Sequence, residues 1–223
     1  MMIVIERIPG PVATIYEKAT RMVIDIYYGE VAEGVVSHLR TGKILDLGTG
    51  PGYLPIEIVK RAPLMRVDGI DLGRKLIKMA RANALRAGVA DRVHFEIGDA
   101  SRMRFENESY DMVISTGMLH MLRNPVKVLR ECYRVLKPDC EAWIYDPAQV
   151  SSRMNRRRWK ASFTLRERFF FKLFSLYTRI NPPHTYDRKE IISMIASTDF
   201  REYRIEEEGK EIKIRLKKRG IKS

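Results

Sequence analysis

Three glycines and one acid lie close together in the segment Ile44–Gly52, which reads ILDLGTGPG. Asp46 precedes Gly48, and Gly50 and Gly52 follow at alternate positions. Because glycine has no Cβ, this spacing lets the backbone turn sharply and lets a ligand approach it closely. A dinucleotide-binding fingerprint expects its third glycine at position 53, which is a tyrosine here. A carboxylate beside the loop would repel a pyrophosphate, so the loop favours a positively charged nucleoside over a dinucleotide.

Two further acids follow apolar runs that read as strands. Asp71 ends the run 66–71, and Asp99 comes shortly after the run 93–97. Ligands of open α/β sheets bind at the carboxyl ends of the strands, so we expect both acids beside the glycine loop. There Asp71 can accept hydrogen bonds from two ribose hydroxyls, and Asp99 can accept one from an adenine amino group. Each acid alone could equally be a helix cap or a turn residue. The ordered set of loop and acids predicts a nucleoside site.

The elements that position these residues alternate between strand and helix. Short apolar runs separated by amphipathic segments at this pitch predict a parallel sheet covered by helices on both faces. A further helix begins at a capping box of Asp187 with Glu190, and two alternating segments around Gly209 predict an antiparallel hairpin. The expected strands are 43–47, 66–71, 93–97, 110–115, 141–145, 203–207 and 211–216, and the expected helices are 53–61, 74–86, 125–136 and 187–197.

The length of 223 residues predicts a single domain over residues 1–223. We divide it into N-terminal helices over 1–40, a nucleoside-binding core over 43–146, a basic and aromatic insertion over 150–186, and a last helix with the hairpin over 187–219. No apolar run is long enough to cross a bilayer, and the start of the chain does not resemble a secretion signal. Two cysteines cannot form a disulfide framework, so we expect a cytoplasmic protein. Abundant Lys, Arg, Glu and Ile with a single glutamine favour a thermophile.

The net charge of +13 is concentrated in two segments. Residues 151–189 hold eleven Lys and Arg against two acids, and residues 210–223 hold seven against one. The first segment also carries a run of aromatic residues. It could pack on the core, form a lid over an apolar acceptor, bind RNA phosphates through Arg156–Arg158 with Trp159 stacking on bases, or contact an anionic membrane through residues 153–172. The oligomeric state is not predicted.

These motifs together resemble the class I S-adenosylmethionine-dependent methyltransferases over about residues 43–146. Ile44–Gly52 resembles the first motif of that family, Val67–Leu72 the second and Phe95–Ala100 the third. Met103–Ser115 and Thr116–Asp139 are similar to the subgroup that methylates small molecules, including quinone precursors and sterols. That subgroup usually closes this stretch with Lys-Pro-Gly-Gly, whereas here Asp139 and Cys140 follow Lys-Pro.

The resemblance implies a Rossmann-like, doubly wound α/β sheet of seven mostly parallel strands with an antiparallel last strand. It also implies S-adenosyl-L-methionine as cofactor and a small or apolar acceptor as substrate. An RNA methyltransferase that uses the basic insertion, or a non-catalytic subunit that binds S-adenosylmethionine, are the alternatives. The residues expected to contact the cofactor are Asp46, Gly48, Thr49, Gly50, Gly52, Asp71, Leu72, Asp99, Ala100 and Ser115.

His120, just past the fourth strand, is the histidine best placed to serve as a general base. A base is needed only when the acceptor is a hydroxyl or carbon, since an amine or a thiol can attack without one. The other reading is a polar residue that lines the pocket or caps the next helix. The remaining histidines, His38, His94 and His184, lack metal-ligand spacing, so no metal is expected.

Overall fold

The computed structural model describes residues 27–147, 186–208 and 211–220. Residues 1–26 of the expected N-terminal helices and residues 150–185 of the basic, aromatic insertion therefore lie outside the described part. Among the residues that are described, no helix combines the length and apolar character that a membrane crossing demands.

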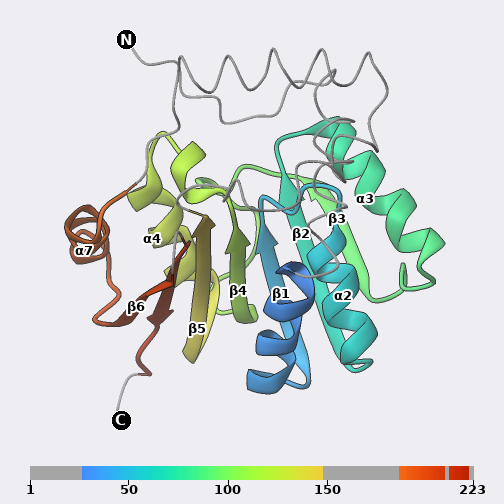
Figure 1. The fold of residues 1–223 in the computed structure, drawn as a ribbon, viewed down its shortest axis with the longest axis horizontal. Coiled ribbons are helices and arrows are strands. Elements are labelled where there is room, and N and C mark those ends of the chain that lie inside the picture. Colours follow the sequence, from blue (N-terminus) through green and yellow to red (C-terminus); the bar gives the residue numbers. More distant parts are fainter. Residues whose placement is uncertain (1–26, 148–185, 209–210, 221–223) are drawn as a thin grey trace.

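Seven strands form one sheet in the order β3-β2-β1-β4-β5-β7-β6 (Figure 1). β1 to β5 pair in parallel, whereas β7 pairs antiparallel with both β5 and β6. The prediction of a mostly parallel sheet with an antiparallel last strand is therefore confirmed. The strands are β1 Gly42–Leu47, β2 Met65–Asp71, β3 Val93–Ile97, β4 Tyr110–Thr116, β5 Leu136–Pro147, β6 Glu202–Glu208 and β7 Glu211–Lys217.

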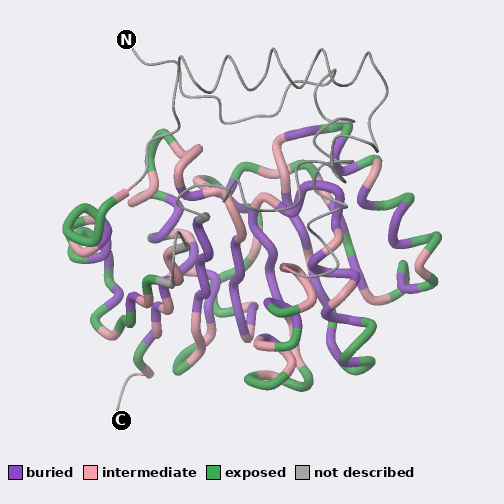
Figure 2. Tube along the Cα trace, viewed as in Figure 1, coloured by how far each residue is buried: buried purple, intermediate pink, exposed green. Residues whose placement is uncertain are grey.

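Helices cover both faces of this sheet, as its two separate apolar clusters require. Residues 27–38, which are helical, pack with α2 (Tyr53–Arg61) and α3 (Arg74–Arg86) on one face. α4 (Pro125–Val135) and α7 (Arg188–Ala196) pack on the other. Along β1, successive side chains enter opposite clusters, and the central strands are buried along most of their length (Figure 2).

The helix ends follow the capping signals in the sequence. The Asn124 side chain accepts a hydrogen bond from the backbone N–H of Lys127, and Pro125 occupies the first turn of α4. At the start of α7, Asp187 and Glu190 form the expected reciprocal capping box.

β5 differs from its predicted bounds. The sequence places a helix end and a turn at residues 136–140 and begins the strand at Glu141, but the strand starts at Leu136 and runs for 12 residues. Leu136 pairs with Tyr110, and the register shifts between Tyr110 and Met112. Asp139 adopts a φ of 63°, and its carboxylate accepts a hydrogen bond from the Gly220 N–H. The residues around Pro138 therefore form an irregularity within β5, whereas the sequence predicts a turn before the strand.

Candidate functional site

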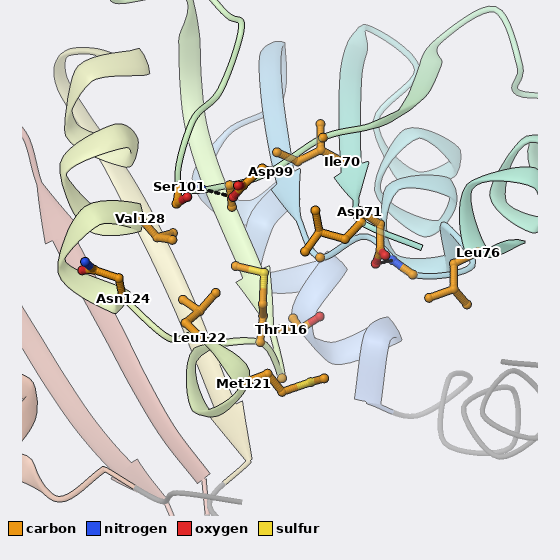
Figure 3. Close-up of a pocket in the computed structure, with 17 residues that line it drawn as sticks. Ile70, Asp71, Leu76, Asp99, Ser101, Thr116, Met121, Leu122, Asn124 and Val128 are labelled. Carbon is orange, nitrogen blue, oxygen red and sulfur yellow. Dashed lines mark hydrogen bonds between the residues drawn. The ribbon is translucent and has the colours of Figure 1, made fainter. Parts of the chain in front are cut away.

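A cavity opens where β1, β2, β3 and β4 end, at the carboxyl edge of the sheet (Figure 3). It encloses about 910 Å³ of space, part of it open to solvent. Figure 3 places Asp71 and Leu76 across the cavity from Leu122 and Val128. The lining residues are Gly48, Gly50, Ile70, Asp71, Leu72, Leu76, Gly98, Asp99, Ala100, Ser101, Thr116, Gly117, Met118, Met121, Leu122, Asn124 and Val128.

The charge of this lining matches the expectation of a cationic ligand. Two of its side chains are carboxylates, Asp71 and Asp99, and none of the described residues that line it is a Lys or an Arg. A pyrophosphate would need positive groups or a cluster of backbone N–H donors to offset its charge. The cavity therefore suits a ligand that carries positive charge and an adenosine-like body.

The glycine loop turns back on itself between β1 and α2. Gly48, Gly50 and Gly52 all adopt positive φ values, of 69°, 54° and 79°, which are strained for any residue with a Cβ. The backbone N–H groups of Gly48 and Thr49 both donate to the Ile70 carbonyl, at 2.9 and 3.0 Å. β2 thus holds the loop in place, and Gly48 and Gly50 face the cavity.

Asp71 binds the loop and the next helix at the same time. Its Oδ2 accepts a hydrogen bond from the Gly50 N–H at 3.0 Å, and its Oδ1 accepts one from the Gly73 N–H at 2.7 Å. A carboxylate oxygen has two lone pairs and can accept more than one hydrogen bond. The residue expected to bind ribose is therefore also the one that sets the shape of the glycine loop.

Asp99 ends the β3 side of the cavity beside an apolar wall. Its Oδ1 accepts a hydrogen bond from the Ser101 N–H at 2.8 Å, which fixes the carboxylate in an Asx turn (Figure 3). Ala100 lies next to it, and Leu122 and Val128 lie opposite. A flat apolar ring with an exocyclic amino group fits this combination.

Four of the predicted cofactor residues lie outside this lining: Asp46, Thr49, Gly52 and Ser115. The Ser115 hydroxyl is buried and donates to the Leu47 carbonyl at 3.1 Å, so it joins β4 to β1. Gly52 caps the start of α2. Direct contact of these residues with a cofactor stays a prediction.

Asp46 is a buried carboxylate beneath the loop. It is 2% exposed, and its Oδ1 makes no hydrogen bond within the described part of the chain. Burial, and secondarily the nearby charge of Asp71, raises the pKa of Asp46 to about 7. The Thr49 hydroxyl offsets part of this increase, although its Oγ1 makes no hydrogen bond of standard geometry among the described residues.

This pKa predicts how stability depends on pH. The folded chain keeps the Asp46 proton up to about pH 7, whereas the unfolded chain releases it near the ordinary pKa of 3.8. Stability is therefore lost as the pH rises from about 4 to about 7, by about 3–4 kcal/mol from this group. We expect Asp46→Asn to remove this loss, which urea unfolding of the ligand-free protein at pH 5 and pH 8 would measure. Asp91→Asn, at an exposed position, is the control. An unchanged difference between the two pH values in Asp46→Asn would contradict the assignment.

His120 lies in a short helical turn, η1 (Leu119–Met121), directly after β4. Its Nδ1 lies 2.6 Å from Oδ1 of Asp146, near the carboxyl end of β5. Asn124, not His120, caps α4, so that part of the alternative reading is wrong. The sequence reasoning did not single out Asp146, although the rule that identified Asp71 and Asp99 applies to it too. Asp146 directly follows the predicted strand 141–145, at the carboxyl end of that strand.

Comparison with known proteins agrees with this architecture. A family model described as a methyltransferase domain matches residues 44–139. The demethylmenaquinone methyltransferase of Lactobacillus johnsonii is 26% identical over 170 residues, which cover 74% of this chain and 66% of that one. The 27-O-demethylrifamycin SV methyltransferase of Amycolatopsis mediterranei is 36% identical over 101 residues, which cover 45% of this chain and 37% of that one. The chain thus spans less than two thirds of the length of these curated relatives.

A solved structure from Methanococcus maripaludis, a candidate S-adenosyl-L-methionine-dependent methyltransferase, has the same fold. It superposes with a TM-score of 0.74 at 20% sequence identity and covers 94% of this chain and 93% of its own. The number of strands, the antiparallel last strand, the glycine loop after β1 and the acids at the ends of β2 and β3 are also those that the sequence resemblance implied. Residues 44–139 therefore match a methyltransferase domain, and the chain has the fold of that solved structure.

Proposed function

We propose that this protein transfers the methyl group of S-adenosylmethionine to a small-molecule acceptor. The observation that carries the proposal is the cavity at the carboxyl edge of the sheet. It joins a glycine loop, two carboxylates and an apolar wall, without a cationic side chain among its described lining residues. The small-molecule class is supported by relatives that are named for quinone and rifamycin methylation.

The residues present fit this cofactor. Asp71 would hold the ribose hydroxyls, Asp99 the adenine amino group, and Gly48 and Gly50 would let the amino-acid part pass close to the backbone. A Cβ at Gly48 would lie 2.8 Å from the Met118 sulfur, so the Met118 side chain would have to move to admit one. Asp46, whose pKa is raised to about 7 in the ligand-free chain, would have to lose its proton to offset the positive charge of the amino-acid end.

When bound, the cofactor supplies an activated methyl group on a positively charged sulfur. The protein's part is to hold donor and acceptor in line and to exclude water. Carboxylates close to the sulfur would stabilise the starting cation more than the transition state, in which the positive charge disperses. Placing the acids at the ribose, at the adenine and beneath the loop avoids that loss.

Calorimetry with S-adenosylmethionine and S-adenosylhomocysteine tests the first half of this proposal. Transfer of a radiolabelled methyl group to small phenols and quinols, to RNA and to protein tests the second. Binding followed by labelling of small molecules is the expected result. Labelling of RNA alone, with binding that weakens steeply as salt rises, would instead favour the basic segments as an RNA surface. Absence of binding at millimolar cofactor would overturn the proposal, and binding without transfer to any class would favour a non-catalytic subunit.

A further inference from the structure

The pair formed by His120 and Asp146 is the strongest polar contact near the cavity that cofactor binding does not use. Asp146 is 5% exposed, and its Oδ1 lies 2.6 Å from Nδ1 of His120. A distance this short between an imidazole and a carboxylate indicates a charge-assisted hydrogen bond. An ionised carboxylate can only accept hydrogen bonds, so Nδ1 of His120 is the donor.

This hydrogen bond fixes which nitrogen of His120 is available for chemistry. With the proton of the neutral ring on Nδ1, the lone pair stands on Nε2. Among the described residues no hydrogen bond to Nε2 is found, and the His120 side chain is 20% exposed. Asp146 therefore holds the imidazole ring through Nδ1, and no described residue binds Nε2. This is the arrangement of a general base that is oriented by an acid.

The pair also lies beside the cofactor cavity. η1 connects residues that line it, since Met118 and Leu122 flank the turn and Met121 belongs to it. The Gly117 N–H donates to the Tyr145 carbonyl at 2.7 Å and ties this turn to β5. His120 does not itself line the cavity, but it lies in the turn that does and is joined by Asp146 to the carboxyl end of β5.

We propose that His120 is the general base of the reaction, that Asp146 is its positioning residue, and that the acceptor is a hydroxyl with the acidity of a phenol or an enol. This inference rests on the proposed methyltransferase function. The acceptor oxygen gives its proton to Nε2 and forms a bond to the methyl carbon as the carbon–sulfur bond breaks. The sulfur keeps that electron pair and departs as a neutral thioether, and the imidazolium then releases the proton to water.

The acidity of the acceptor follows from what an imidazole can deprotonate. A free imidazole has a pKa of about 6.5 and a phenol one of about 10, whereas the pKa of a simple alcohol is far higher. Transfer of a proton to an imidazole is therefore much less unfavourable from a phenol than from an alcohol. A neutral amine attacks with its own lone pair, and a thiol ionises largely unaided. Among these acceptors, a phenol-like hydroxyl is the one whose methylation the His120–Asp146 pair would accelerate most.

Tyr186, an ionisable neighbour of Asp146 in the described part of the chain, does not compete for this role. Tyr186, which precedes α7, lies close enough to Asp146 for the charge of that carboxylate to affect its pKa. Its pKa is raised by burial first and then by the charges of Asp146 and Glu190, so the ring keeps its proton at neutral pH. Tyr186 is therefore a neutral neighbour of the carboxylate.

The first test needs no acceptor. Long-range ¹H–¹⁵N spectra of the protein, with the His120 signals identified by their loss in His120→Ala, report which nitrogen carries the proton. The Nδ1–H form is expected in the wild type. In Asp146→Asn the amide can donate to the ring, and the Nε2–H form should gain population. An Nε2–H tautomer in the wild type would overturn the inference.

The second test compares acceptors of the same shape, 2-naphthol and 2-naphthylamine, within a panel of phenols and their matched amines. Transfer to the hydroxyl members is expected. His120→Ala and Asp146→Asn should each lower kcat toward them by about 100-fold or more, with affinity for S-adenosylmethionine unchanged within about twofold. Asp146→Glu should recover part of the loss. His94→Ala, which removes an exposed histidine beside Glu96 on β3, is the matched control and should leave kcat unchanged.

The outcomes separate this inference from the proposed function. Transfer to amines alone, no transfer to any hydroxyl member despite intact cofactor binding, or unchanged kcat in both variants would each overturn the role of the pair. The methyltransferase assignment fails if the cofactor does not bind, or if it binds and no class of acceptor is labelled.

Discussion

Asp71→Asn is expected to weaken binding of S-adenosylmethionine by about 100-fold. In the folded chain one carboxylate oxygen accepts from the Gly50 N–H and the other from the Gly73 N–H. The amide of asparagine can accept at only one of these places, and its NH₂ group would face an N–H donor at the other. Hydrogen bonds to charged groups contribute about 1.5–3 kcal/mol each, and the loss of one would also distort the loop that borders the cavity.

Titration calorimetry with S-adenosylmethionine and S-adenosylhomocysteine measures this effect. Asp91→Asn removes an exposed acid that lies outside the cavity lining and should bind both ligands as the wild type does. Asp99→Asn should have a smaller effect than Asp71→Asn, because Asp99 accepts a single backbone hydrogen bond. Wild-type affinity in Asp71→Asn would mean that the carboxylate contacts neither the ribose nor a loop that binding needs.

Gly52→Ala is expected to lower the free energy of unfolding by about 2–5 kcal/mol. At a φ of 79°, a residue with a Cβ is strained by about 1–2 kcal/mol. The added Cβ would also lie 2.7 Å from Phe95 Cζ and 2.8 Å from Ala80 Cβ, both of which are buried. Forcing an extra carbon into such packing costs about 1–3 kcal/mol more.

Gly88→Ala is the matched control for this second prediction. Gly88 has a similar φ of 68°, but an added Cβ would meet no atom within 4 Å. Only the backbone strain remains, so a loss of about 1–2 kcal/mol is expected. Urea unfolding of both variants measures the difference. Equal losses would show that the contacts with Phe95 and Ala80 relax without cost.

The sequence predicts the central part of the fold well because its local signals favour the same helices and strands that tertiary packing stabilises. The glycine loop, the buried runs before Asp71 and Asp99 and the capping box at Asp187 each act over a few residues. The helices 53–61 and 74–86 and the strand 93–97 have the bounds that the sequence predicts. The topological rule for parallel sheets then brings the loop and the two acids to one edge.

The features that the sequence does not predict depend on pairing between distant residues. β5 extends back to Leu136 because β4 offers Tyr110 as a partner, and this overrides the turn signal of Pro138. The pairing of Asp146 with His120 joins residues that are 26 positions apart, and no local pattern specifies it. Burial of Asp46 likewise depends on how the loop closes above it, so its pKa could not be read from the motif.

Phe95 links the glycine loop to a much later part of the chain. An added Cβ at Gly52 or at Gly69 would run into its ring, so this one aromatic side chain supports both the loop and the strand beside it. Its carbonyl accepts two hydrogen bonds from the Arg81 guanidinium. During synthesis, the loop leaves the ribosome more than forty residues before the ring that holds it in shape. A nascent chain therefore gains the ability to capture its nucleoside only after β3 has emerged and docked.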